Sequence, residues 1–482
     1  MFKQSQIQTN SVNDNLKELL ADYISEQGIS GINLDDKGVP DDLNSDSILS
    51  KSQKKAFELF KKGESLSIFS SAGCGKSTLI KIMQEYHEKK QDGKNMYLTS
   101  TTGISAFNIG GCTIHSFMGI GTGESELSFL IRKILRNKIL CQRLFMTDIL
   151  VIDEISMLSA SIFEKINYIF QYFKKNNSLF GGIQLILTGD LMQILPIFNN
   201  VLNKEDIDER LIIESDIFMK MFKNKIVILN ENFRQKNDST FVNLLLRLRK
   251  GEHTKQDIDL LKSRLNYDKD DPVVKKSINL VSYNKKAQNI NDYNLKKLQG
   301  PEYTYEVEYK KRRKHELASK NETYNILQKE LESQFNQKGI VKVYLRKGAR
   351  VILIKNLDVS GGLVNGSIGT IINFKEGYPE VLFDSGIKHV VSKVDWELEL
   401  DGNKVTAVQI PLMLAYAITI NRSQSLSLDS AVMDLSDVFA DHMKYVALSR
   451  VRNISGLFLK SFDENKITIN QKMKDFINKY ER

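Results

Sequence analysis

The fold is decided by the stretch SSAGCGKST, which spans Ser70–Thr78. An apolar run, LSIF at residues 66–69, comes before it, and apolar residues follow it at helical spacing from Leu79 to Tyr86. A strand, a glycine-bearing loop, Gly-Lys-Ser and a helix form the setting that a phosphate-binding loop requires. The glycines let backbone N–H groups point inward around an anion, and the positive end of the following helix faces the same place. The sequence therefore predicts a site for the phosphates of a nucleotide.

Individual residues of this loop have predicted roles. Lys76 is expected to reach the β- and γ-phosphates of a nucleoside triphosphate, and Ser77 is expected to bind Mg²⁺ through its hydroxyl. Ser70 stands where the motif usually has its first glycine, and serine is less free than glycine to adopt a positive φ angle. An ordinary strand-to-helix turn is the alternative, which the flanking strand and helix disfavour. The predicted nucleotide-binding residues of the loop are Ser71, Ala72, Gly73, Cys74, Gly75, Lys76, Ser77 and Thr78.

The composition indicates more than one domain, because the chain has 482 residues and 41% of them are hydrophobic. Lys and Arg number 68 and Asp and Glu number 59, which gives a net charge of +9. This basic excess favours a polyanionic partner, although it is also typical of a solvated surface. The three cysteines, Cys74, Cys112 and Cys141, lack metal-ligand spacing, which predicts a reducing compartment, the nucleus or the cytoplasm. No apolar run spans a bilayer and no signal peptide is visible, so no membrane contact or secretion is expected.

Two α/β cores are predicted after a flexible tail at residues 1–46, which is rich in Asn, Ser, Gln and Asp. The first core, residues 47–228, has apolar strand candidates separated by helices, which is typical of a parallel sheet covered on both faces. The second core, residues 229–482, has a further apolar run at residues 278–282. The strand candidates of the first core are residues 66–69, 96–100, 149–152, 183–188 and 226–229.

Each core contains a predicted insertion. Residues 118–147 combine glycines with a basic helix and interrupt the first core. Residues 300–404 interrupt the second core, and their short Val, Ile and Leu runs punctuated by glycines indicate a small antiparallel barrel. For the basic cluster Lys310–Lys314, three interpretations remain: a nuclear import signal, a contact for duplex DNA, or a solvated helix face, of which the last is favoured.

Acidic and amide side chains at the ends of predicted strands are catalytic candidates. Asp153 is expected to hold Mg²⁺, and Glu154 to orient and deprotonate an attacking water. Gln193 follows the strand at residues 183–188 and is expected to sense a γ-phosphate through a hydrogen bond. Ligands of open parallel sheets bind at the carboxyl ends of the strands, so these side chains should meet Lys76 there. The alternative for the acidic pair is a solvated strand end.

Three further side chains are candidates for the same site. Gln53, upstream of the loop, carries an amide that can read the edge of an adenine, although most such glutamines face solvent. Phosphoryl transfer needs cations that stabilise the charge on the phosphate oxygens. Arg234 and Arg450 are candidates for this role, but spacing alone does not select them from the other arginines.

A series of stretches, in order along the chain, resembles the Pif1-like family of superfamily 1B DNA helicases. The resemblance covers about residues 48–459. The stretches FGGIQ at residues 180–184 and LVNGS at residues 363–367 point to Pif1-like members rather than to helicases in general. The other matching stretches are residues 71–78, STTGISAFNIGGCTIHSF at 100–117, VIDEISM at 151–157, GDLMQ at 189–193, NFRQ at 232–235, AITINRSQS at 417–425 and YVALSRVR at 445–452.

The resemblance implies two RecA-like P-loop domains with ATP and Mg²⁺ in the cleft between them. It implies a motor that moves 5′→3′ on single-stranded DNA, unwinds forked duplex and works in replication, recombination, repair or telomere maintenance. Arg234 and Arg450 would enter the ATP site from the second domain. The insertion at residues 118–147 would be the family's wedge domain, 1B, and that at residues 300–404 its SH3-like β-barrel domain, 2B. The expected form is a monomer or a DNA-induced dimer.

The resemblance also implies which residues face the DNA. Base stacking needs an aromatic ring, and Phe117 carries one. Without the resemblance, Phe117 is more typical of a core residue and His115 of a structural histidine. The residues implied to contact DNA are Thr102, Thr113, His115 and Phe117 in the first domain and Thr419, Asn421 and Ser423 in the second.

Several residues depart from the family pattern, and these departures concern the affinity for DNA and the coupling of ATP hydrolysis to movement along it. Residues 421–425 are NRSQS where the family usually has HKSQG, so an imidazole and a glycine are lost. An aromatic pair is lost at residues 191–192, and Leu144 stands where Trp is common.

Two other functions share parts of this pattern. An ATPase that remodels nucleic acid without separating strands would share every nucleotide motif. A P-loop kinase or GTPase would hydrolyse nucleotide independently of DNA and would leave the second core and Arg450 unexplained.

Overall fold

The computed structural model describes most of the chain from Leu49 onward. The described ranges are 49–196, 208–235, 238–310, 322–358, 361–363, 365–400, 403–424 and 426–481. The tail predicted for residues 1–46 and the basic residues Lys311–Lys314 lie outside these ranges. Within them, no helix has both the length and the apolar character needed to cross a membrane.

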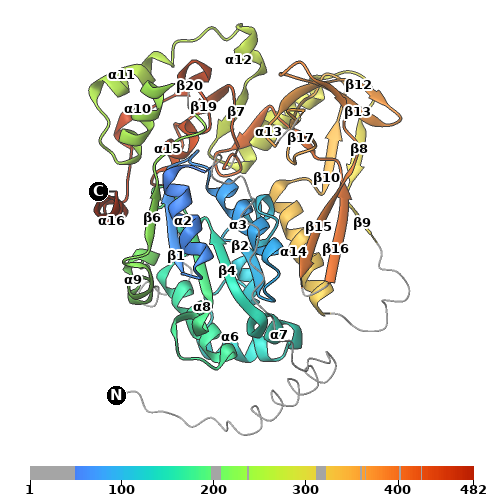
Figure 1. Cartoon of the computed structure of the whole chain (residues 1–482). Coiled ribbons are helices and arrows are strands. Elements are labelled where there is room, and N and C mark those ends of the chain that lie inside the picture. The colour runs from blue at the N-terminus through green and yellow to red at the C-terminus, as the bar shows by residue number, and fades with distance from the viewer. Residues whose placement is uncertain are drawn as a thin grey trace. The chain divides into compact units, whose positions relative to one another are not determined.

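The first core is a six-stranded sheet with the order β3-β2-β4-β5-β1-β6, shown in Figure 1. Every neighbouring pair is parallel, as predicted. The central strands are almost entirely buried, which agrees with their continuous apolar sequences. The strands are β1 (Leu66–Ser70), β2 (Asn95–Ser100), β3 (Cys112–Thr113), β4 (Thr147–Asp153), β5 (Gln184–Gly189) and β6 (Ile226–Leu229).

Helices cover both faces of this sheet. Ile68 packs in one apolar cluster with residues of α2 and α3, whereas its neighbour Phe69 packs in another with residues of α8 and α9. Successive residues of a strand point to opposite faces, so two separate cores flank the sheet. The helices are α2 (Lys51–Lys61), α3 (Lys76–Lys90), α4 (Gly103–Asn108), α5 (Ile114–Met118), α8 (Ala160–Lys174) and α9 (Asp216–Phe222).

The first insertion is a pair of helices, α6 (Leu127–Leu135) and α7 (Lys138–Met146). Leu130 of α6 and Leu144 of α7 are buried in the same cluster as residues of α8. Leu144 is therefore a core residue.

The second core is a four-stranded parallel sheet with the order β18-β7-β19-β20. The run predicted at residues 278–282 forms β7. The strands are β7 (Ile278–Val281), β18 (Ala417–Thr419), β19 (Ala431–Asp434) and β20 (Leu457–Ser461). The helices of this core are α10 (Ser239–Arg249), α11 (Lys255–Ser263), α12 (Pro272–Lys276), α13 (Asn284–Lys297) and α15 (Met443–Leu448).

The second insertion is antiparallel, as predicted, and comprises three sheets and helix α14 (Glu322–Lys338). The sheets are β14-β13-β12-β11-β17, β15-β16-β9 and β10-β8. The antiparallel pairing extends past the predicted boundary at about residue 404, because β16 and β17 still pair with insertion strands. The strands are β8 (Tyr303–Glu306), β9 (Glu308–Tyr309), β10 (Lys342–Leu345), β11 (Arg350–Leu353), β12 (Ile368–Lys375), β13 (Tyr378–Phe383), β14 (Lys388–Val390), β15 (Val394–Leu400), β16 (Asn403–Gln409) and β17 (Leu412–Leu414).

The C-terminal helix, α16 (Gln471–Tyr480), returns to the first core (Figure 1). Met473 and Ile477 are buried in the first core's apolar cluster. The ring of Phe476 lies 6.4 Å from that of Phe69 and 6.0 Å from that of Phe218. The chain after the second sheet thus fastens the two cores together, which spacing along the sequence does not reveal.

Candidate functional site

The phosphate-binding loop joins β1 to α3, as predicted. Gly73 and Gly75 have φ angles of +85° and +77°, which favour glycine. A Cβ on Gly73 would lie 2.7 Å from Cβ of Arg234, so the glycine also permits a close approach. Ser70 is the last residue of β1 and does not have a positive φ, so serine in place of the usual glycine causes no backbone strain. Its Oγ accepts a hydrogen bond from Nζ of Lys76 at 2.7 Å.

A pocket beside this loop brings together catalytic candidates from both cores. Lys76 and Glu154 belong to the first core, whereas Arg450 follows α15 of the second. Lys76 and Arg450 thus line the same pocket, as a nucleotide site between two cores requires. The lining residues are Gln53, Ala72, Gly73, Cys74, Gly75, Lys76, Ser77, Thr78, Glu154, Gln193, Phe233, Arg234, Ser427, Arg450 and Arg452.

Arg234 reaches the pocket from the segment that leaves β6. The N–H of Phe233 donates to the carbonyl of Gly73 at 2.9 Å, which ties this segment to the loop. The guanidinium of Arg234 donates to Oγ of Ser427 at 2.8 Å and to the carbonyl of Ser449 at 3.0 Å. The expectation that Arg234 enters from the second core needs correction, because this residue lies where the two cores join.

Lys76, Arg234 and Arg450 place three cations in the pocket. None of them forms an ion pair with a carboxylate anywhere in the described ranges; Arg450, for example, donates to the carbonyl of Val446 and to Oγ of Ser449. Burial and the neighbouring charge of Arg450 lower the pKa of Arg234 to about 9. Burial also lowers the pKa of Arg450. Because buried charge without a counter-ion is costly, the pocket favours an anion such as a triphosphate.

Asp153 and Glu154 stand at the end of β4. The carboxylate of Asp153 accepts hydrogen bonds from Oγ of Ser105 at 2.7 Å and from Oγ1 of Thr188 at 2.5 Å. Glu154 has a φ angle of +53°, and its Oε2 is buried with no hydrogen-bond partner among the described residues. Backbone strain and an orphaned carboxylate oxygen are typical of functional sites. Burial and the adjacent Asp153 charge raise the pKa of Glu154 to about 7, which suits a general base.

The residues present fit a Mg²⁺ ion that binds together with a nucleotide. Mg²⁺ is usually held by one or two carboxylates, waters and substrate phosphates. The exposed hydroxyl of Ser77 and the carboxylate of Asp153 offer suitable oxygens, and Oε2 of Glu154 has capacity for a bound water. The described part of the chain has no group of three or more His, Cys, Asp or Glu that would hold a metal by itself.

A buried polar network joins the two cores beside the pocket, and spacing along the sequence did not reveal it. Asp190, which follows β5, pairs with Arg249 of α10 at 2.7 Å. The hydroxyl of Tyr445 in α15 donates to Oδ2 of Asp190 at 3.1 Å and accepts from the N–H of Ala72 at 3.0 Å. Nε2 of Gln193 donates to the same carboxylate at 3.3 Å. A single tyrosine therefore connects the phosphate-binding loop to the second core.

The amide of Gln53 is engaged within the chain. Its Oε1 accepts from the N–H of Ser50 at 2.9 Å, as part of the capping box of α2. Its Nε2 donates to the carbonyl of Gly75 at 3.3 Å. Gln53 is buried although it lines the pocket, so recognition of an adenine would require exchange of these hydrogen bonds and stays a prediction.

Phe117 is fully buried, and its predicted role in base stacking needs correction. Its ring lies 5.2 Å from that of Tyr97 and 5.6 Å from the guanidinium of Arg143. The alternative, a core residue, agrees with this position. His115 is mostly buried, and burial lowers its pKa although the nearby Glu330 carboxylate acts in the opposite direction.

Thr102 and Thr113 remain partly exposed. Their hydroxyls accept backbone hydrogen bonds, Thr102 from Ser105 at 3.2 Å and Thr113 from Ser116 at 3.3 Å. The carboxylate of Glu330 in α14 accepts from the N–H of Thr113 at 3.4 Å and from its hydroxyl at 3.5 Å. An acidic side chain of the second insertion therefore lies where the resemblance implies a contact with DNA.

In the second core, Asn421 is exposed, whereas Thr419 and Ser423 are buried. Oγ1 of Thr419 accepts from the N–H of Arg422 at 3.2 Å, and Oγ of Ser423 donates to the carbonyl of Ile420 at 2.6 Å. Both hydroxyls shape the turn after β18. The prediction that Thr419 and Ser423 contact DNA directly needs correction, because both side chains are buried. Asn421 remains as the candidate.

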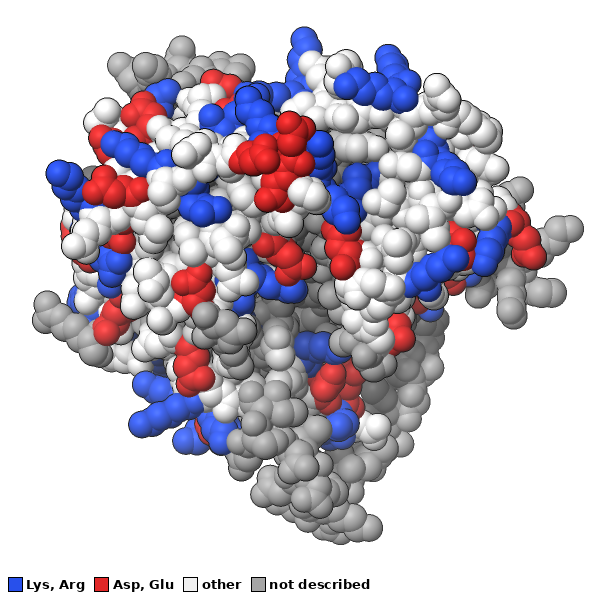
Figure 2. All heavy atoms as spheres, turned by 90° about the horizontal axis from the view of Figure 1, so that it is seen from above, with Lys and Arg blue, Asp and Glu red and all other residues white. Residues whose placement is uncertain are grey.

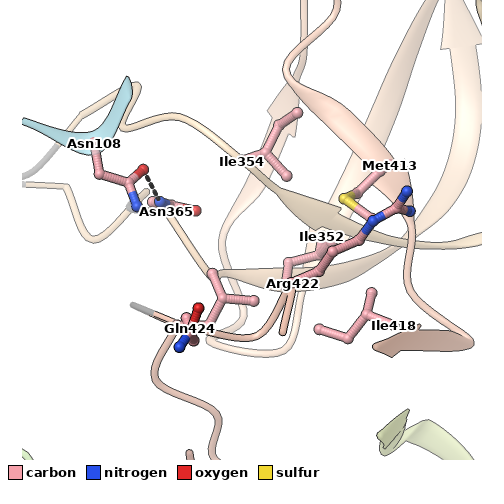
Figure 3. Close-up of a pocket in the computed structure, with 9 residues that line it drawn as sticks. Asn108, Ile352, Ile354, Asn365, Met413, Ile418, Arg422 and Gln424 are labelled. Atoms are coloured by element: carbon pink, nitrogen blue, oxygen red, sulfur yellow. Dashed lines mark hydrogen bonds between the residues drawn. The ribbon is translucent and has the colours of Figure 1, made fainter. Parts of the chain in front are cut away.

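A pocket lies beside this turn, between the first core, the second insertion and the second core (Figure 3). Across it, Nδ2 of Asn365 donates to Oδ1 of Asn108 at 3.4 Å. Burial lowers the pKa of Arg422, which pairs with no described carboxylate, so its charge is uncompensated. The lining residues are Asn108, Ile352, Ile354, Asn365, Met413, Ile418, Arg422, Gln424 and Leu426.

Figure 2 shows Lys and Arg interspersed with Asp and Glu over one face of the molecule. No single basic stripe crosses the part of this face that is described. The case for a nucleic-acid partner therefore depends on individual sites more than on the net charge of +9.

Comparison with known proteins identifies the family. The PIF1-like helicase model matches residues 48–259, and the model of the Pif1 2B domain matches residues 330–374. Protein 030L of Invertebrate iridescent virus 6, which is uncharacterized, is 33% identical over 500 residues that cover 88% of this chain and 93% of that protein. The chain belongs to the PIF1-like helicase family. The ATP-dependent DNA helicase PIF1 of Danio rerio is 32% identical over 433 residues, which cover 88% of this chain but only 62% of that relative.

Solved Pif1 structures share the fold. The unliganded Pif1 from Bacteroides sp matches with a TM-score of 0.72 and 25% identity, over 90% of this chain and 97% of that one. The Bacteroides Pif1 bound to single-stranded DNA matches with a TM-score of 0.60 and 26% identity, with the same coverage. The TM-score is therefore higher for this unliganded structure than for this DNA-bound one.

Proposed function

We propose that this PIF1-like protein is an ATP-dependent DNA helicase that moves 5′→3′ along single-stranded DNA and unwinds forked duplex. The observation that carries this proposal is the pocket shared by Lys76 of the first core and Arg450 of the second. A nucleotide that contacts both cores favours their closure, and loss of its γ-phosphate favours reopening. Similarity to an ATP-dependent DNA helicase PIF1 and to a Pif1 bound to single-stranded DNA supports the same function.

Residues of both cores contribute to ATP hydrolysis. Ser77 and Asp153 would hold Mg²⁺, which would supply positive charge to neutralise the phosphates. Glu154 orients the attacking water and accepts its proton, which its raised pKa allows near neutral pH. Lys76 from the first core and Arg450 from the second stabilise charge on the transferred phosphoryl group.

Gln193 and Tyr445 link this chemistry to the motion of the cores. The amide of Gln193 bonds Asp190, and Tyr445 bonds both Asp190 and the N–H of Ala72. A triphosphate that accepts hydrogen bonds from the backbone N–H groups of the loop competes with the hydroxyl of Tyr445 for the N–H of Ala72. Nucleotide binding therefore changes the hydrogen bonds of a residue in the second core.

Forked duplexes distinguish this proposal from its alternative, a DNA-stimulated translocase that remodels nucleic acid or nucleoprotein without unwinding. We expect ATP-dependent strand separation from a fork with a 5′ single-stranded tail and little from a duplex with only a 3′ tail. ATP hydrolysis without strand separation on any substrate would favour the translocase. Separation from the 3′ tail alone would contradict the proposed direction.

Lys76→Ala is expected to lower ATP turnover in the presence of single-stranded DNA by about 100-fold or more, the scale for removing one preorganised donor to transition-state charge. Phosphate release measures turnover, and binding to a labelled strand should stay near the wild-type value. Lys81→Ala is the matched control, because Lys81 is an exposed residue of the same helix. Retention of turnover in Lys76→Ala would rule out the loop as the catalytic site.

Glu330→Gln is expected to tighten single-stranded DNA binding by roughly fivefold, which corresponds to about 1 kcal/mol. The Glu330 carboxylate is buried against Thr113, where a phosphate would have to bind, and a neutral amide neither repels phosphate nor holds Thr113 as strongly. Fluorescence anisotropy with a labelled oligonucleotide measures the change. Glu332→Gln, on the same helix, should bind as the wild type does. Unchanged or weaker binding by Glu330→Gln would contradict this account of α14.

A further inference from the structure

Two exposed aromatic rings stack on each other at the surface of the second core. The side chain of Tyr283 is 49% exposed and that of Phe439 is 55% exposed. Their ring centroids lie 5.3 Å apart with an interplanar angle of 24°. Aromatic side chains normally lose most of their surface to the core. A stacked pair left this open to solvent therefore points to a ligand with a flat apolar face.

The pair lies at the edge of the sheet that also carries Asn421. Strand β7 pairs with β18 so that Val281 is level with Thr419, and the N–H of Ile420 donates to the carbonyl of Val281 at 2.9 Å. Tyr283 is two residues beyond Val281, and Asn421 is two residues beyond Thr419. Parallel strands present their carboxyl ends at one edge, where ligands of α/β sheets bind. The rings and the exposed DNA-contact candidate are therefore neighbours.

Phe439 and Asn421 line the same cleft, which passes between the two cores. Its other wall includes Leu195 and Pro196, which closely follow Gln193 of the nucleotide pocket. Closure of the cores around a nucleotide would therefore narrow this cleft as well. A ligand held here is gripped or released in step with the nucleotide.

The charges of the cleft select a neutral ring over a phosphate. Three carboxylates, those of Glu209, Glu214 and Asp441, line it with one cation, Lys472, which is paired with Glu214 at 2.5 Å. Carboxylates repel phosphate groups, whereas every nucleobase has a π-face that stacks on aromatic side chains. The cleft therefore fits a base that points inward from a strand whose phosphates stay outside.

We propose that Tyr283 and Phe439 form a stacking platform for an unpaired base and that the adjoining cleft receives it. This inference rests on the proposed function, since it names the part of the second core that grips the strand. It also supplies the aromatic contact that the buried Phe117 does not provide.

Tyr283→Ala and Phe439→Ala test the platform. Each is expected to weaken single-stranded DNA binding by roughly 5- to 100-fold, the range for loss of one base–aromatic stack. Tyr283→Phe and Phe439→Tyr keep a ring and should bind nearly as well as the wild type. The matched control is Tyr168→Ala, because Tyr168 is 48% exposed but lies on α8 of the first core. ATP turnover without DNA should not change in Tyr168→Ala.

A strand that lacks bases separates stacking from a structural role. On an abasic oligonucleotide of equal length, the alanine variants should bind as the wild type does, because no base remains to stack. Alanine variants that bind the normal strand as the wild type does, or that lose affinity equally for both strands, would overturn the inference. Neither result would affect the helicase proposal, which fails separately if the wild-type protein binds no single-stranded DNA.

Discussion

Replacing Arg450 with alanine is expected to lower kcat for ATP hydrolysis on single-stranded DNA by about 10³-fold, the lower end of the range for an arginine finger. Arg450 lies in the second core but lines the pocket of Lys76 and Glu154, so it is the cation that exists at the site only when the cores are together. Its guanidinium is fully buried without an ion pair among the described residues, and a γ-phosphate would supply the missing anion. Steady-state phosphate release at saturating ATP and DNA measures the effect.

Three controls keep the Arg450 result interpretable. Arg450→Lys retains the charge but not the planar fork, and should recover only part of the activity. Arg132→Ala removes an arginine from the exposed face of α6 and should have no effect. Because Arg450 also donates to backbone carbonyls, thermal unfolding must show that the variant is folded. A folded Arg450→Ala protein with nearly normal turnover would contradict a site shared between the cores.

Arg249→Met is expected to lower the free energy of unfolding by about 3–5 kcal/mol, the cost of leaving a buried charge without its partner. The side chains of Arg249 and Asp190 are 1% and 0% exposed. Burial alone would raise the pKa of Asp190, but the charges of Arg249 and Lys76 hold it below its ordinary value. Loss of Arg249 leaves this buried carboxylate without its main counter-charge. Urea denaturation followed by circular dichroism measures the loss.

Arg247→Met is the matched control on the same helix. Arg247 is also paired with a carboxylate, Asp257, at 2.6 Å, but its side chain is 39% exposed, so we expect a loss of at most about 1 kcal/mol. The double variant Asp190→Asn/Arg249→Met should recover part of the stability, because neither charge remains buried. Equal losses for Arg249→Met and Arg247→Met would show that the Asp190 pair does not hold the cores together.

The strands of the parallel sheets and the nucleotide loop could be predicted because their signals are local. Continuous apolar runs such as residues 149–152 appear only where both faces of a strand are covered, and the run became the buried strand β4. The chemistry of Gly-Lys-Ser is fixed within a few residues of Lys76. Neither inference depends on how distant segments meet.

The parts that sequence could not predict depend on contacts between distant segments. The sequence around Tyr445 does not predict that its hydroxyl forms hydrogen bonds with Ala72 and Asp190, because both partners are far away along the chain. Phe117, Thr419 and Ser423 stand in stretches that resemble DNA-facing motifs, yet packing buries all three side chains. A motif therefore does not identify which of its side chains reach solvent; among the candidates in the second core, Asn421 is the exposed one.

The extent of the second insertion and the packing of the C-terminal helix could not be predicted from the sequence, for a related reason. Strands β16 and β17 have the same apolar character as strands of the second core, and only their antiparallel partners assign them to the insertion. The apolar face of α16 predicts burial but not its location against Phe69. Contacts with distant segments of the chain determine both the extent of the insertion and the position of α16.

The dependence of ATP turnover on single-stranded DNA tests the central claim most directly. We predict that the wild-type protein hydrolyses ATP slowly alone and much faster when an oligonucleotide is added, because strand binding stabilises the closed pocket that Lys76 and Arg450 share. Turnover that stays the same with and without DNA would contradict a motor driven by that pocket.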